Sequence, residues 1–257
     1  MAQPVEVLFR RNVVREALRA NRRRLHRLIV ERGANRAELA DLLREAERRG
    51  LPIVEQDKHT MNTATEGVHH QGVILEVGPY PYVDLADVLA VTRARGEAPF
   101  VLALDLVHDP RNVGALLRSA EAAGVHGVVI QEKRAGEITP TVVTTSAGAS
   151  EHLRIARVVN LGRALKDLKQ ADAWIAGLAL TPEAQDYAQA NLTGGLALVV
   201  GNEGAGLRRL IRESCDFIVK IPMLGHVESL NAAVAGSIVL FHAAYQRRQR
   251  ATGNGQR

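Results

Sequence analysis

The sequence is poor in cysteine and in aromatic residues. Its 257 residues include a single cysteine, Cys215, so no disulfide can form within the chain. No cysteine and histidine spacing of the zinc type occurs, and we therefore expect no metal site and no redox chemistry. Phenylalanine, tryptophan and tyrosine together make up 4% of the residues. That is too few for a platform that stacks successive unpaired bases.

Long hydrophobic runs are absent as well. The longest apolar stretch, residues 230–245, is interrupted by Asn231, Ser237 and His242. A bilayer span needs about 18 to 20 uninterrupted apolar residues, so we expect no contact with a membrane. The first 15 residues contain no apolar block followed by a small-residue cleavage site, and no signal peptide is expected. These absences predict a cytoplasmic protein.

The basic residues are concentrated at one end of the sequence. Hydrophobic residues make up 46% and charged residues 24%, which is a globular balance, and the formal net charge is +5. Residues 1–50 hold 13 lysines and arginines against 7 acidic residues, an excess of +6. A guanidinium suits bidentate phosphate binding. Charge alone leaves two interpretations open, a nucleic-acid surface and a solvated helix face. If the surface binds nucleic acid, the candidate residues are Arg10, Arg11, Arg22, Arg23 and Arg24.

Hydrophobic periodicity predicts a small α/β unit at the start of the chain. We expect helices at residues 13–30 and 36–49. Short strands are expected at residues 52–54 and 72–77, and the unit ends near Gly78. A proline-rich and then polar stretch predicts a linker over residues 79–98, which could hold a short helix at 84–94.

Apolar strands alternate with helical patterns from Phe100 onward. The strands contain valine, isoleucine and leucine without polar alternation, which is typical of a parallel sheet covered on both faces. We therefore predict a doubly wound α/β domain, with a final helix over residues 229–249 and a frayed tail at 251–257. The expected strands are residues 100–106, 125–130, 153–158, 174–179, 196–200 and 217–221.

A first motif follows the first of these strands. Asp109 and Pro110 are typical of a helix start, which places Asn112 in the first turn, at the sheet edge where α/β proteins bind ligands. Arg118 follows six residues later, about 120° around the helix. Taken alone, Asn112 could equally support the helix start and Arg118 could be a surface residue.

Two further motifs follow the strands at 196–200 and 217–221. Gly201, Gly204 and Gly206 lie within six residues. Their spacing matches neither the dinucleotide-binding fingerprint nor the phosphate-binding loop of nucleoside triphosphatases. A tight turn with Glu203 as an exposed cap would also explain them. Further on, Ser229 and Asn231 stand at the start of the last predicted helix. One N-cap would explain one of these two residues, not both.

Together the three motifs resemble the SpoU (TrmH) branch of the SPOUT RNA 2'-O-ribose methyltransferases. The family's motifs centre on Asn-x-Gly-x-x-x-Arg, Gly-Asn-Glu-Gly and Ile-Pro-Met-x-Gly-x-x-x-Ser-Leu-Asn. Here they are residues 112–118, 201–204 and 221–231. Residues 146–152 look like the family's substrate-side helix. Within the family the chain most resembles the bacterial 23S rRNA guanosine 2'-O-methyltransferases.

The resemblance implies a fold and a cofactor. It divides the chain into an N-terminal α/β RNA-binding domain at residues 1–78, a linker at 79–98 and a SPOUT catalytic domain at 99–250. It also implies a deep trefoil knot, which the alternation of strands and helices cannot predict. A homodimer through the knotted domain is expected. The cofactor is S-adenosylmethionine, and the cofactor-binding residues carried over from the family are Gly201, Ile221, Met223 and Leu230.

The resemblance also assigns the chemistry of the site. The catalytic residues that it implies are Arg118, Asn112, Glu203, Ser229 and Asn231. Arg118 acts at the ribose 2'-hydroxyl, but a guanidinium normally stays protonated, so a general base and a phosphate ligand that stabilises the alkoxide remain alternative roles. The expected substrate is 23S rRNA. Transfer RNA ribose, an rRNA adenosine and a non-catalytic RNA-binding role are the alternatives.

Overall fold

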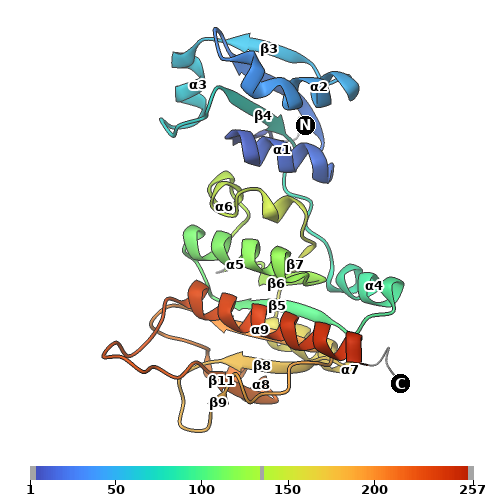
Figure 1. The fold of residues 1–257 in the computed structure, drawn as a ribbon, viewed down its shortest axis with the longest axis vertical. Coiled ribbons are helices and arrows are strands. Elements are labelled where there is room, and N and C mark those ends of the chain that lie inside the picture. Colours follow the sequence, from blue (N-terminus) through green and yellow to red (C-terminus); the bar gives the residue numbers. More distant parts are fainter. Residues whose placement is uncertain (1–3, 134–135, 254–257) are drawn as a thin grey trace. The chain divides into compact units, whose positions relative to one another are not determined.

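The computed structural model describes residues 4–133 and 136–253, which form two compact units (Figure 1). Unit 1 contains the chain up to Pro81 together with Ile138–His152. Unit 2 contains Tyr82–Glu137 and the chain from Leu153 onward. The boundaries therefore differ from those expected from the sequence, because a segment from the middle of the chain belongs to the first unit.

Unit 1 is built on a four-stranded sheet with the order β1-β4-β2-β3. Strand β4 is antiparallel to β1 and β2, whereas β2 and β3 are parallel. Helix α6 (Pro140–Thr145) and the 3-10 turn η2 (Ala149–Glu151) belong to the same unit. Its other elements are β1 (Glu6–Phe9), α1 (Arg11–Ala20), β2 (Leu25–Glu31), η1 (Arg36–Leu39), α2 (Ala40–Arg48), β3 (Ile53–Gln56), α3 (Lys58–Ala64) and β4 (Val73–Val77).

The single helix expected over residues 13–30 is wrong. Helix α1 ends at Ala20, because Asn21 adopts the left-handed conformation with φ 49° and its N–H bonds to Ala17. The residues after it form β2, whose Leu28 is fully buried between two neighbouring strands. The leucines of β2 happen to continue the spacing of the α1 stripe, so helical periodicity joined two different elements. Strand β1 and helix α3 were not expected.

Unit 2 is a parallel sheet of seven strands in the order β7-β6-β5-β10-β8-β11-β9. All of its strand pairs are parallel, which confirms the parallel sheet predicted from the apolar strands. Its elements are α4 (Leu85–Arg95), β5 (Phe100–Asp105), α5 (Pro110–Ala123), β6 (Gly127–Gln131), β7 (Ile155–Val158), α7 (Leu161–Gln170), β8 (Trp174–Leu178), β9 (Gln185–Asp186), β10 (Leu196–Gly201), α8 (Arg209–Ser214), β11 (Phe217–Lys220) and α9 (Ala232–Gly253).

Helices cover both faces of this sheet, as a doubly wound fold requires. On one face, Val101 and Ala103 of β5 share a core with residues of α4, α7 and α8. On the other face, α5 and α9 lie side by side (Figure 1). A Cβ added at Gly236 of α9 would lie 2.6 Å from Leu116 of α5 and 3.0 Å from Val200 of β10. Helix α9 therefore lies tightly against both α5 and the middle of the sheet.

The structure corrects three boundaries in unit 2. The stretch expected as a linker, residues 79–98, contains α4, whose Val88 is fully buried in the core of this unit. The last helix starts at Ala232 rather than at Ser229. It also continues to Gly253 into the tail expected to fray, and residues 254–257 lie outside the described residues. Within the described ranges, no helix is long and apolar enough to cross a membrane.

Candidate active site

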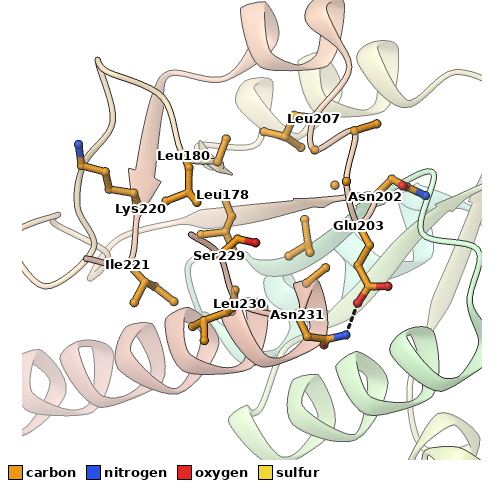
Figure 2. A pocket seen from close by; sticks show the side chains of 18 of the residues that line it. Leu178, Leu180, Asn202, Glu203, Leu207, Lys220, Ile221, Ser229, Leu230 and Asn231 are labelled. Carbon is orange, nitrogen blue, oxygen red and sulfur yellow. Dashed lines mark hydrogen bonds between the residues drawn. The ribbon is translucent and has the colours of Figure 1, made fainter. Parts of the chain in front are cut away.

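A cavity of about 600 Å³ opens at the carboxyl ends of β8, β10 and β11 (Figure 2). The ends of neighbouring parallel strands are where open α/β sheets bind their ligands. Its volume lies in the usual range of small-molecule and cofactor pockets. The lining residues are 178–181, 200–207 and 229–232, with Arg212, Lys220, Ile221, Met223 and Ala235.

The walls of the cavity are mainly apolar side chains and exposed backbone. Leu178, Leu180, Ile221 and Leu230 supply apolar surface, and the loop after β10 supplies main-chain groups (Figure 2). The charged residues of the lining are Glu203, Arg212 and Lys220. Such a site suits a ligand with both apolar and polar parts that the backbone contacts directly. It is less suited to a polyphosphate, which requires a concentration of positive charge.

The loop Gly201–Leu207, called the cofactor loop from here on, folds back on itself. The Gly206 N–H donates to the Asn202 carbonyl at 2.9 Å, and the Asn202 N–H donates to the Gly206 carbonyl at 3.2 Å. A Cβ at Gly201 would meet the backbone C and O of Gly206 at 2.4 Å. Gly204 has open space around it but adopts φ +84°. The close approach of the Gly206 backbone therefore requires glycine at position 201, and the positive φ favours glycine at position 204.

Asn231 joins the three sequence motifs. Its Oδ1 accepts the N–H groups of Ala233 at 2.9 Å and Val234 at 3.2 Å, so it caps α9. Its Nδ2 donates to Oδ1 of Asn112 at 3.0 Å and to Oε1 of Glu203. Figure 2 shows the Glu203 carboxylate and the Asn231 amide pointing toward one another. Of the two residues expected at this helix start, Asn231 is thus the N-cap, and Ser229 lies in the loop before it.

The structure places most of the predicted site residues at this cavity. The cofactor candidates Gly201, Ile221, Met223 and Leu230 all line it, as do the catalytic candidates Glu203, Ser229 and Asn231. Asn112 is buried behind them and reaches the site through its bond to Asn231. Arg118 does not line the cavity. It is exposed on α5 and has no hydrogen bond or ion pair within the described residues.

The structure contradicts the prediction that Arg23 contacts RNA. Its side chain is buried, with Nε and Nη2 each 2.9 Å from a carboxylate oxygen of Glu151. Its Nη1 lies 2.5 Å from Glu6. The guanidinium also lies 4.8 Å from the centre of the Tyr80 ring, in a cation–π arrangement. Arg23 therefore stabilises unit 1 internally.

The other four candidate arginines differ in their availability. Arg24 is exposed, and Arg10 is half-buried with a positive φ of 76°. Arg11 forms an ion pair with Glu38. Arg22 donates to the carbonyl of Pro81 at 3.4 Å. Two of the four candidates, Arg11 and Arg22, therefore make contacts within unit 1.

Sequence reasoning missed the part of the cavity formed after β8. Residues 178–181, together with Lys220 and Arg212, line the site but were not singled out. Strand β8 lies between β10 and β11, so its carboxyl end opens between the two motif loops. The signal was present in the apolar strand at 174–179, but the sheet order that makes it relevant cannot be derived from the chain.

Comparison with known proteins agrees with this geometry. The model of the SpoU rRNA Methylase family matches residues 99–241, and the model of the RNA 2'-O ribose methyltransferase substrate-binding domain matches residues 8–83. A 23S rRNA (guanosine-2'-O-)-methyltransferase RlmB from Photorhabdus laumondii is 40% identical over 245 residues, covering 94% of this chain and 98% of that protein. A putative TrmH family tRNA/rRNA methyltransferase, YacO from Bacillus subtilis, is 36% identical over 248 residues, covering 96% and 98%.

A solved structure shares the fold over nearly the whole chain. The SpoU methyltransferase AviRb from Streptomyces viridochromogenes, in complex with the cofactor AdoMet, aligns with a TM-score of 0.78 at 24% identity. The alignment covers 96% of this chain and 91% of that one. Family models and relatives thus agree over both units, and the chain belongs to the SpoU rRNA methylase family.

Proposed function

We propose that this RNA 2'-O-methyltransferase transfers a methyl group from S-adenosylmethionine to the ribose 2'-hydroxyl of a guanosine in 23S rRNA. The relative from Photorhabdus is named for this reaction, and it matches nearly the full length of the chain. The structures from Streptomyces viridochromogenes and Sinorhizobium meliloti contain AdoMet. The relative from Bacillus subtilis is named for tRNA or rRNA, so tRNA is the competing substrate.

The residues of the cavity fit this cofactor. The volume is about 600 Å³, and the apolar walls suit an adenosine whose polar edges meet main-chain groups. The backbone of Gly201, Ile221, Met223 and Leu230 would hold it. When bound, S-adenosylmethionine supplies a methyl group already activated by a sulfonium. The protein therefore has to exclude water, orient the ribose and accept or move one proton.

Neutral polar side chains at the rim, those of Asn231 and Ser229, supply orientation. The Asn231 amide is fixed by four hydrogen bonds, two to the start of α9 and one each to Asn112 and Glu203. Ser229 adds a hydroxyl to the same wall. Arg118 is exposed, so its guanidinium is available to an incoming phosphate or to the alkoxide that forms at the 2'-oxygen. We propose that Arg118 acts there, as a base or as a stabilising cation.

One observation carries this proposal: hydrogen bonds from Asn231 to Asn112 and Glu203 bring the three sequence motifs together at the rim of the cavity. The test is transfer of labelled methyl from S-adenosylmethionine to 23S rRNA and to tRNA, followed by mapping of 2'-O-methyl groups. We expect a single guanosine of 23S rRNA. The Arg118→Ala variant should lose methyl transfer but retain cofactor binding. Methylation of tRNA alone would contradict the proposed rRNA substrate. Full turnover by Arg118→Ala would contradict the proposed role of Arg118.

We also propose that unit 1 delivers the RNA to unit 2, which holds the cavity, and that the reaction takes place in the cytoplasm. The family model for substrate binding covers most of unit 1. Exposed Arg24 is the best placed of the candidate arginines, whereas Arg23 is excluded by burial. Arg24→Ala should weaken rRNA binding and lower its salt dependence. An unchanged salt dependence would place the RNA contact elsewhere.

A homodimer and a deep trefoil knot complete the proposal. Three apolar side chains on one face of α9 are exposed to solvent, Val234 at 49%, Phe241 at 49% and Tyr245 at 54%. A second copy would cover this stripe. Phe241→Glu should convert a dimer to monomers in analytical ultracentrifugation, and a wild-type monomer would contradict the assembly. After β11, which lies near one edge of the sheet, the chain returns to form α9, which packs against α5. This return supports the proposed knot.

A further inference from the structure

A buried carboxylate lies directly behind the cofactor loop. Asp105 is the last residue of β5, its side chain is 0% exposed, and it pairs in register with Gly201, the first residue of the loop. Its Oδ2 accepts the backbone N–H of Arg208 at 2.9 Å, and its Oδ1 accepts Nε of the same residue at 2.7 Å. Nη2 of Arg208 lies 2.5 Å from Oδ1. Among the residues that the structure describes, this one arginine supplies all hydrogen bonds and the ion pair of the Asp105 carboxylate.

Arg208 also reaches a second strand. Its Nη2 donates to Oε1 of Gln131 at 2.7 Å, and Gln131 is the last residue of β6. Arg208 itself directly follows Leu207, the last residue of the cofactor loop, and precedes α8. A single side chain therefore ties the end of the loop to the ends of two neighbouring strands.

The loop is held at both of its ends by groups that do not line the cavity. Gly201 is fixed by the register of β10 against β5, opposite Asp105. The far end is fixed by the ion pair to the same Asp105. A further tether lies between them, because Nδ2 of Asn202 donates to the carbonyl of Leu106 at 2.8 Å. Neither Asp105 nor Arg208 is among the residues that line the cavity.

We infer that Asp105 and Arg208 form a positioning pair that holds the cofactor loop in its binding conformation. The inference rests on the proposed function, since it takes S-adenosylmethionine as the ligand. A buried carboxylate that loses its partner is left uncompensated, and the chain nearby has to move to hydrate it. The cofactor loop begins opposite Asp105 and ends beside Arg208, so we expect it to be the segment displaced. Lysine cannot replace the planar fork that contacts Asp105 and Gln131 together.

A purely structural role would have a different signature. If the pair only stabilised unit 2, its loss would lower the melting temperature and leave the remaining folded protein with normal affinity. A positioning role changes the dissociation constant of S-adenosylmethionine in folded protein. Because Glu203 of the same loop also bonds to Asn231, cofactor affinity in folded protein, and not kcat, is the readout of this role.

The test compares Arg208→Met and Arg208→Lys with a matched control on the next residue. Arg209 has a side chain that is 76% exposed and lies 3.6 Å from Glu213 on the same helix, so Arg209→Met removes a guanidinium without touching the loop. By calorimetry on full-length protein, we expect Arg208→Met to raise the Kd of S-adenosylmethionine at least tenfold and Arg208→Lys to raise it by less. Arg209→Met should stay within twofold. Equal Kd values for Arg208→Met and wild type would overturn the inference.

A second measurement needs no cofactor. Amide hydrogen exchange at Asn202 and Gly206 reports whether the loop is closed on itself in the free protein. Exchange should accelerate at least tenfold in Arg208→Met and remain unchanged in Arg209→Met. If Arg208→Met does not fold, Arg208→Lys carries the same comparison. Wild-type protein that fails to bind S-adenosylmethionine would refute the proposed function, whereas unaltered exchange would refute the positioning pair.

Discussion

Replacing Gly201 by alanine should damage the cofactor loop more than any other glycine substitution in it. The added Cβ would lie 2.4 Å from the backbone C and O of Gly206 and 2.6 Å from the N of Leu207, where ordinary contact begins at 3.4 Å. Because these atoms belong to the backbone, no side-chain rotation can relieve the clash. The two strands of the loop have to separate by about 1 Å.

The loss of stability in Gly201→Ala follows from the hydrogen bonds that this separation breaks. Two backbone hydrogen bonds join Asn202 and Gly206, and each contributes about 1 kcal/mol net. Forcing an extra methyl into a closely packed site costs about 1 to 3 kcal/mol more. We expect Gly201→Ala to lower the free energy of unfolding of unit 2 by about 3 to 5 kcal/mol. For a domain of this size, that corresponds to a fall in melting temperature of about 6 to 20 °C.

Two other glycines provide controls. Gly204 has open space but adopts φ +84°, so Gly204→Ala carries only the left-handed strain of about 1 to 2 kcal/mol. Gly194 lies outside the loop, has nothing within 4 Å and needs no positive φ, so Gly194→Ala should be nearly neutral. For all three variants, circular dichroism measures thermal stability and calorimetry measures the affinity for S-adenosylmethionine. A Gly201→Ala protein as stable as Gly204→Ala, with wild-type affinity, would refute the steric argument.

Two buried ionisable groups give further predictions. Nδ1 of His126 accepts the N–H of Phe100 at 3.0 Å, and burial lowers the pKa of His126 from 6.5. The neutral His126 therefore contributes its full stabilisation above about pH 6.5, and this contribution is lost as the pH falls through the lower pKa of the folded state. The melting temperature should therefore fall on acidification, and His126→Asn should reduce the slope without removing it, because burial also lowers the pKa of His70. Equal slopes would contradict this. Arg23→Met should destabilise unit 1 by about 3 to 5 kcal/mol in urea unfolding at neutral pH, because it leaves the Glu151 carboxylate buried and unpaired. Arg23→Met combined with Glu151→Leu should recover most of that loss, whereas additive losses would show that the pair does not interact.

The strands of unit 2 could be predicted because each is apolar throughout. Strand β10 reads Leu-Ala-Leu-Val-Val-Gly and is buried along its whole length, so composition alone identifies it. Strand β9 has two residues and exists only because Gln185 pairs with Val219 of β11, which no local pattern reveals. The position of residues 138–152 in unit 1 depends on contacts such as that between Arg23 and Glu151, 128 residues apart. Non-local contacts of this kind leave no periodicity to detect.

The predicted part of the site is the part whose residue types are unusual for their position. Glu203 between glycines and Asn231 in an apolar stretch stand out in the sequence, and the structure brings them together at the cavity. Asp105 does not stand out in the sequence, because an acidic residue at the end of a strand is ordinarily solvated, and only the structure shows that it is fully buried. The cavity wall after β8 depends on the sheet order, which the sequence does not contain.

The division of the chain has a consequence for its synthesis. The backbone passes between the two units at Pro81–Tyr82, Glu137–Ile138 and His152–Leu153. Unit 1 therefore cannot complete its core when residue 81 leaves the ribosome. Arg23 and Tyr80 have to wait for Glu151 and Ser150, to which they bond. An N-terminal domain usually finishes folding first during translation. Here the N-terminal unit closes only after more than half of the polypeptide has emerged, so neither unit can be obtained intact by cutting the gene at one point.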